Sequence, residues 1–142
     1  MTNDVMDVSV ENYLKAIYKI QMGSEGHVKT QGISEALKVS PAAVSDMLRK
    51  LSHKQYIQYA PYKGVLLTAT GEALGRNIVR RHRVLELYLN KVLGFSWDQV
   101  HEEAERLEHA VSDKLIDRLE EVMGYPKFDP HGDPIPARDG KI

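Results

Sequence analysis

Apolar side chains recur at intervals of three and four over much of this 142-residue chain, which is the spacing of amphipathic helices. A first helix is predicted over residues 10–20 and a short second one over residues 30–37. Ser40 and Pro41 mark a strong helix start, because a capping hydroxyl precedes a proline at the first helical position. The third helix then continues to Leu51.

The pattern changes after the third helix. Two short β-type runs, residues 56–59 and 65–68, flank a segment with proline and glycine that suits a hairpin loop. Helical spacing then recurs in three segments. We predict one helix from Thr70-Gly71 to Gly94, a second from Ser96 to Val111, and a third from Ser112 to Gly124. We therefore predict a mainly α fold. Residues 1–72 form a winged helix-turn-helix DNA-binding domain with a small β-hairpin wing, and residues 73–142 form a helical domain.

Composition excludes several classes of protein. The chain has no cysteine, which rules out a disulfide scaffold, a zinc ribbon, an iron–sulfur site and thiol catalysis. It contains no apolar run long enough to span a bilayer, and its first residues lack the basic and apolar regions of a signal peptide. We expect a cytoplasmic protein without a membrane partner.

The formal net charge of -1 conceals an uneven distribution. Residues 47–71 contain no acid but four cationic side chains, whereas residues 101–121 contain eight acids against three bases. The two regions therefore suit different partners, nucleic acid for the first and cations for the second.

The cationic region coincides with the predicted recognition helix and wing. A recognition helix needs small residues at its start, so that backbone and base edges approach closely in the major groove, while lysines and arginines reach phosphates. The alternative is a solvated helix face, and Asp46 either reads a cytosine amino group or points away from DNA. The candidate residues for double-stranded DNA are Ser40, Pro41, Ala42, Ala43, Ser45, Arg49, Lys50 and Lys63.

The acidic region contains histidines at helical spacing. Two helices that each present a carboxylate and an imidazole across their interface are a known way to build a metal site in a helical bundle. Oxygen and nitrogen ligands alone favour Mn(II), Fe(II) or Co(II) over softer metals. The alternative is again a solvated face, and His27, His53 and His131 are interpreted as surface residues. The candidate ligands are His82, Glu86, His101, Glu105, Glu108 and His109.

Several separated motifs, in order, resemble the diphtheria toxin repressor family of iron-dependent repressors and manganese transport regulators. This resemblance implies a homodimer in which each subunit has an N-terminal winged helix and a C-terminal dimerisation domain. Divalent metal is then the co-repressor for a palindromic operator near metal-uptake genes. The motifs are the segments 12–18, 39–45, 62–68, 81–83, 101–113 and 132–136.

The resemblance also assigns roles to single residues. His82, Glu108 and His109 match metal ligands of both branches, while Glu86 and His101 match ancillary-site residues of the iron type. Asn12 falls on a metal-binding position of the first helix, where the iron type has methionine and the manganese type aspartate.

Two positions separate the branches. Glu105 stands where the iron type has cysteine and the manganese type has glutamate, and it is the reason to place Mn(II) before Fe(II) as cofactor. Lys15 stands where the manganese type has a further glutamate, and its ammonium would repel a second cation.

The leading hypothesis is thus a Mn(II)-dependent repressor that is not an enzyme and takes no small organic substrate. An Fe(II)-dependent repressor of the same family is the next. A metal-independent winged-helix regulator answering a small organic ligand and a metal-dependent hydrolase on Glu105 and Glu108 are weaker alternatives.

Overall fold

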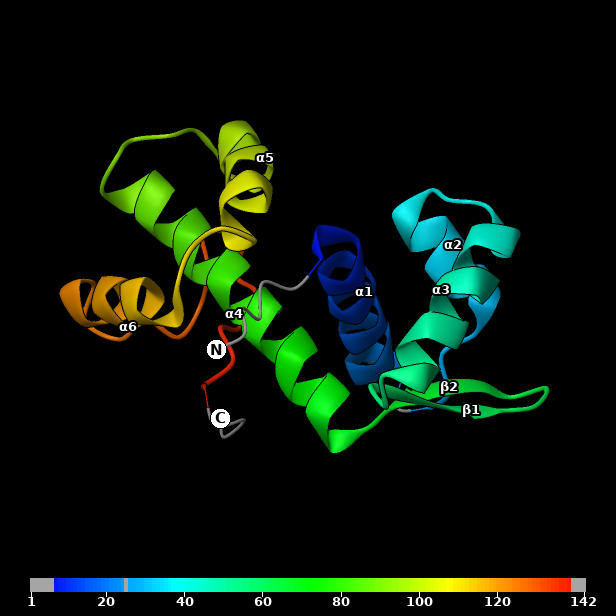
Figure 1. Ribbon diagram of the computed structural model, residues 1–142. Coiled ribbons are helices and arrows are strands. Elements are labelled where there is room, and N and C mark those ends of the chain that lie inside the picture. Colours follow the sequence, from blue (N-terminus) through cyan, green and yellow to red (C-terminus); the bar gives the residue numbers. More distant parts are fainter. Residues whose placement is uncertain (1–6, 25, 139–142) are drawn as a thin grey trace. The chain divides into compact units, whose positions relative to one another are not determined.

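The computed structural model describes residues 7–24 and 26–138. The chain divides into two compact units between Gly75 and Arg76, and each unit is described by itself. Figure 1 identifies the helices and strands of both. None of the described helices is long and apolar enough to cross a lipid bilayer.

Three helices form the body of the first unit: α1 (Val8–Ser24), α2 (Thr30–Leu37) and α3 (Pro41–His53). Ser40 caps α3, since its hydroxyl accepts a hydrogen bond of 3.1 Å from the backbone N–H of Ala43. The apolar sides of the three helices meet in one core, because each helix has its large aliphatic residues on a single stripe. Fully buried members of this core include Leu14, Ile17, Ile33, Val44 and Leu51.

A two-stranded antiparallel hairpin, β1 (Ile57–Ala60) and β2 (Gly64–Leu67), follows α3 and extends beside it in Figure 1. Val65 on β2 exchanges two backbone hydrogen bonds with Val28, which attaches the hairpin to the segment before α2. Gly64 has φ +113°, and a Cβ at this position would lie 2.4 Å from the carbonyl oxygen of Val28. Only glycine therefore permits this close approach of the wing to the core.

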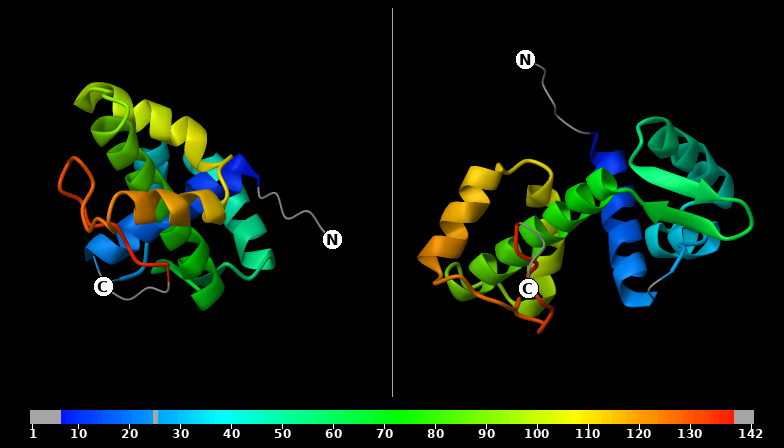
Figure 2. Two further views of the ribbon diagram at one scale, coloured as in Figure 1. Left: turned by 90° about the vertical axis from the view of Figure 1, so that its left-hand side faces the viewer. Right: turned by 90° about the horizontal axis from the view of Figure 1, so that it is seen from below.

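The second unit contains most of α4 (Ala69–Lys91), together with α5 (Trp97–Glu108) and α6 (Asp113–Val122). Figure 2 shows α5 and α6 against the C-terminal part of α4. Their core is a separate apolar cluster that consists of Val84, Leu85, Leu89, Val100, Ala104 and Ile116.

Charged side chains also join α4 to α6. Arg80 is 2% exposed and pairs with Asp117 and Glu120 on α6. Arg81 donates to Asp113 at 3.1 Å and to the carbonyl oxygen of Glu108 at 3.3 Å. The end of α5 and the start of α6 are thus held against the same turn of α4.

The predicted mainly α fold is confirmed, with some differences at the element ends. The first helix is longer than its apolar stripe, and both strands are displaced by one residue from the apolar runs. The displacement follows from the backbone pairing of Ile57 with Leu67 and of Ala60 with Gly64, which the alternation of side chains does not determine.

Candidate metal centre

The buried imidazole of His82 on α4 is the centre of a cluster between α4 and α5. Its Nδ1 atom lies 2.6 Å from Oε1 of Glu108, and its Nε2 atom lies 3.1 Å from Oε2 of Glu86. Nε2 also lies 3.1 Å from Nδ1 of His101, and the two rings meet edge to face. The helical spacing of four on α4 and the interface with α5 bring these side chains together.

Glu86 is 2% exposed and accepts contacts from several sides. Burial raises the pKa of Glu86, but the hydrogen bond and charge of His82, with bonds from Asp129 and His101, lower it to about 2. The carboxylate is ionised and its ligand atoms converge with those of His82 and His101 within 4.8 Å. This group has the nitrogen and oxygen donors of a divalent-cation site.

A second group of converging ligand atoms shares Glu86. Asp129 and His131 lie in the segment after α6, where Oδ1 of Asp129 accepts from the backbone N–H groups of His131 and Asp133. His131 Nδ1 is 3.8 Å from Oε1 of Glu86, and its ring lies edge to face with Trp97 at 4.8 Å. Burial and the neighbouring Glu86 raise the pKa of Asp129, as expected when two carboxyl groups share one site.

Asp129 is not among the ligands predicted from the sequence, and His131, predicted as a surface residue, is indeed exposed but also belongs to this group. Neither residue has a helical partner, because both lie in an irregular segment whose path the period of the apolar residues does not reveal. The adjacent Asp-Pro-His-Gly-Asp sequence is the only signal that pointed to this turn.

Glu105, Glu108 and His109 share a face near the end of α5 but point to different partners. Glu105 is exposed and contacts His101 Nε2 at 3.0 Å. Glu108 is fully buried, with Oε2 at 3.3 Å from Nε2 of His109, which stands at the C-cap of α5. Across the described part of the chain, their ligand atoms do not gather into a further group of three. Their joint role in metal binding stays a prediction.

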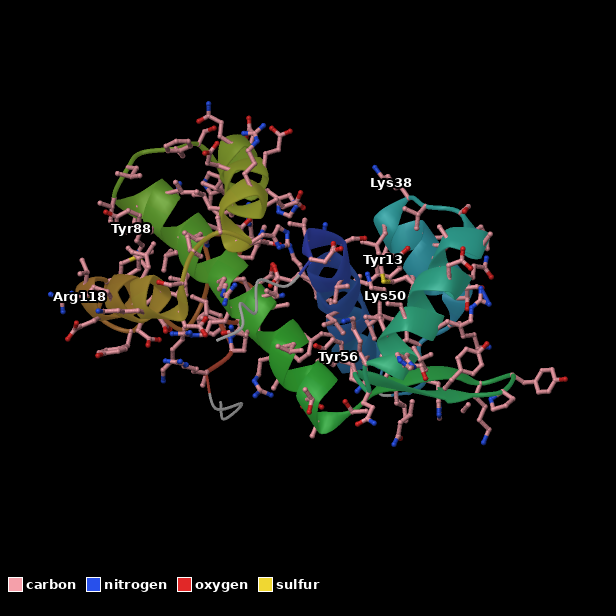
Figure 3. The ribbon with its side chains drawn as sticks, viewed as in Figure 1. Tyr13, Lys38, Lys50, Tyr56, Tyr88 and Arg118 are labelled. Atoms are coloured by element: carbon pink, nitrogen blue, oxygen red, sulfur yellow. The ribbon has the colours of Figure 1, made fainter. Side chains whose placement is uncertain are left out.

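The remaining predicted site residues lie in the first unit. Asn12 is half-buried on α1, and Lys15 is buried on the same helix. Lys50 on α3 is exposed and is labelled in Figure 3, and its Nζ lies 3.9 Å from Oδ2 of Asp7. Lys63 is exposed at the hairpin turn. The other predicted DNA contacts are also exposed, and they are Ser40, Pro41, Ala42, Ala43, Ser45 and Arg49.

Two family models together match nearly the whole chain. Residues 6–65 match the N-terminal DNA binding domain of iron dependent repressors, and residues 68–137 match their metal binding and dimerisation domain. The chain belongs to the iron-dependent repressor family. The family resemblance predicted from the motifs is thereby confirmed.

Individual members of the iron-dependent repressor family place the chain in its manganese branch. It is 36% identical over 121 residues to the HTH-type transcriptional regulator MntR of Oceanobacillus iheyensis, covering 85% of this chain and 81% of the relative. A solved manganese-dependent transcriptional repressor in complex with manganese is 43% identical, with a TM-score of 0.84. The manganese regulator SloR is 39% identical, with a TM-score of 0.80. Each superposition covers 93% of this chain and 60% of the other, so this chain spans about three fifths of those proteins.

Proposed function

We propose that this protein is a divalent-metal-dependent transcriptional repressor that responds to Mn(II). The observation that carries the proposal is the convergence of His82, Glu86 and His101 from two helices, in a chain that also has a winged helix-turn-helix. Family membership supports the same combination of a DNA-binding unit and a metal-binding unit. Glu105 and the absence of cysteine favour manganese over iron, because both make the donor set harder.

The residues of the second unit fit such an ion chemically. When bound, the ion supplies positive charge that offsets the carboxylates of Glu86, Glu108 and Glu105. His82 and His101 would supply imidazole nitrogen, and Arg81 orients the end of α5 through the backbone of Glu108. Asp129 and His131 extend the ligand set beside Glu86. Asn12 remains a ligand predicted from the resemblance alone.

The first unit supplies the DNA-binding surface of the proposed repressor. Small residues at the start of α3 allow the helix to approach base edges in the major groove, and Arg49, Lys50 and Lys63 neutralise phosphates. A homodimer that presents two such helices recognises a palindromic operator, since two-fold protein symmetry matches two half-sites. We expect the operator to control metal-uptake genes and the repressor to act in the cytoplasm.

The test is DNA binding by the whole protein as a function of metal. The DNA upstream of the protein's own gene is titrated with protein in the presence of Mn(II), Fe(II), Co(II), Zn(II) or a chelator, with an unrelated duplex as control. Tighter binding with Mn(II) than with the other metals is expected. Equal binding in the chelator overturns the metal-dependent role and favours a metal-independent winged-helix regulator, whereas the strongest response to Fe(II) identifies the iron-dependent alternative.

A further inference from the structure

A groove of about 400 Å³ runs between α3 and β1 in the first unit. Ser45, Arg49 and Ser52 follow one another at four and three positions and therefore line it from a single stripe of α3. Leu48 contributes its apolar floor, and Tyr59 on β1 closes it from the wing. Neither Ser52 nor Tyr59 belongs to the set of DNA contacts predicted from the sequence.

The groove offers hydrogen-bond donors and positive charge. Three of its five lining residues carry hydroxyl groups and one carries a guanidinium, while none is acidic. Tyr59 is 57% exposed, although its ring is large and apolar. The chain from Met47 to Gly71 contains no acidic residue, so Asp46 is the acidic side chain of α3 that adjoins this lining.

Asp46, three positions earlier on α3, is an acidic neighbour of Arg49. The two side chains form an ion pair, and they are 74% and 75% exposed. Exposed pairs of this kind contribute little stability, because solvent screens the charges. Arg49 can therefore exchange the carboxylate of Asp46 for another anion at small cost.

We propose that this groove binds the sugar-phosphate backbone of DNA, with Tyr59 and Ser52 as hydroxyl donors and Arg49 as the charged contact. The inference rests on the proposed DNA-binding function and extends it to a surface between helix and wing. The stripe of Ser45 and Arg49 lies at the edge of the α3 face that is predicted to enter the major groove. We expect the DNA strand that borders the major groove to pass the side of α3 on which β1 lies. Phosphodiester oxygens accept from all of these donors, and contacts to them carry no base information.

The test measures operator binding of the Mn(II)-loaded full chain by fluorescence anisotropy, at several salt concentrations. Tyr59→Phe and Ser52→Ala should each weaken binding about threefold to tenfold, since each removes one hydrogen bond. Because both groups are neutral, neither change should alter the salt dependence. Arg49→Gln should weaken binding and reduce the slope of log K against log salt by about one.

Tyr125→Phe is the matched control, because Tyr125 is 65% exposed and lies in the second unit. It should bind as the wild type does. A backbone contact also predicts equal losses on the operator and on unrelated DNA. A loss confined to the operator would overturn the assignment to the backbone.

The failure of this inference differs from the failure of the proposed function. If wild-type protein binds the operator with Mn(II) but Tyr59→Phe, Ser52→Ala and Arg49→Gln all bind equally well, the groove is not a DNA contact. If wild-type protein binds no DNA in any metal, the proposed function and the groove assignment both fall. Thermal unfolding of each variant followed by circular dichroism identifies any loss that comes from misfolding, and the wild-type melting temperature is expected for Tyr59→Phe.

Discussion

The Nδ1 atom of His82 lies 2.6 Å from Oε1 of the fully buried Glu108. The opposite ring nitrogen faces Glu86, so a single imidazole bridges two buried carboxylates from two helices. His82 therefore links the group around Glu86 to the end of α5. A substitution of His82 therefore removes a contact of Glu86 and a contact of Glu108 together.

Replacement of His82 by glutamine should weaken Mn(II) binding by more than about tenfold, because a ligand and the partner of two carboxylates are lost together. Isothermal titration calorimetry of the metal alone measures the effect without DNA. His53→Gln is the control, since His53 is exposed at the end of α3. Unchanged Mn(II) affinity in His82→Gln would contradict the placement of the metal at this cluster.

Replacement of Glu105 by cysteine should shift the metal preference toward softer ions. Glu105 is 53% exposed on its side chain and contacts His101, so the change leaves the core of the second unit intact. We expect the ratio of Zn(II) to Mn(II) affinity to rise, because thiolate is a softer ligand than carboxylate. Competition titrations with a chromophoric chelator give both affinities.

Glu102→Cys is the matched control for that experiment, because Glu102 is exposed on the same helix and, unlike Glu105, forms no ion pair with His101 in the described part of the chain. Its metal preference should match that of the wild type. If Glu105→Cys also leaves the ratio unchanged, Glu105 does not decide the metal.

Trp97 should report metal binding at Glu86, Asp129 and His131. It is the only tryptophan of the chain, and its ring lies 4.8 Å from that of His131. A paramagnetic ion held by His131 quenches an indole at this range, so titration with Mn(II) should lower the fluorescence. In His131→Ala the quenching should be largely lost, while full quenching in this variant would place the ion elsewhere.

Protonation of Asp113 in acid should make the second unit less stable. Burial raises the pKa of Asp113, but the hydrogen bond from Asn77 and the charge of Arg81 outweigh it and lower the pKa. A folded-state pKa below the unfolded value gives stability that is present above the unfolded pKa and is lost as pH falls through the folded pKa. The free energy of unfolding of Asp113→Asn should therefore be about 1–3 kcal/mol lower than that of the wild type at neutral pH.

Urea unfolding at a series of pH values measures this effect. The difference between Asp113→Asn and the wild type should shrink as the pH falls below the ordinary aspartate range. Asp98→Asn is a suitable control, because Asp98 is exposed in the first turn of α5. A difference that is constant with pH would exclude the ionised carboxylate as the source of the stability.

Much of the fold follows from local sequence. The period of apolar residues, the cap at Ser40 with Pro41, and the proline and glycine between the strands identified every helix and the hairpin. The element ends were less accurate, because backbone hydrogen bonds rather than side-chain polarity fix them. The spacing of His82 and Glu86, and of His101 and Glu105, likewise predicted contacts that the structure contains.

The tertiary structure decided two relationships that no local pattern contains. Asp129 and His131 reach Glu86 because an irregular segment turns back on the second unit, and such a turn depends on its backbone hydrogen bonds. Tyr59 lies beside the stripe of Ser45, Arg49 and Ser52 on α3, because the twist and register of the two-stranded hairpin place it there.

The sequence by itself therefore determined the elements, their order and the chemical type of both candidate sites. Periodicity and charge act along the chain over a few residues, and they can be read without coordinates. Which side chains converge depends on how helices and loops pack, because ligand geometry requires atoms from distant segments within a few ångströms. Only the folded structure could show that Glu86 belongs to two ligand groups at once, and that the wing and α3 enclose a groove between them.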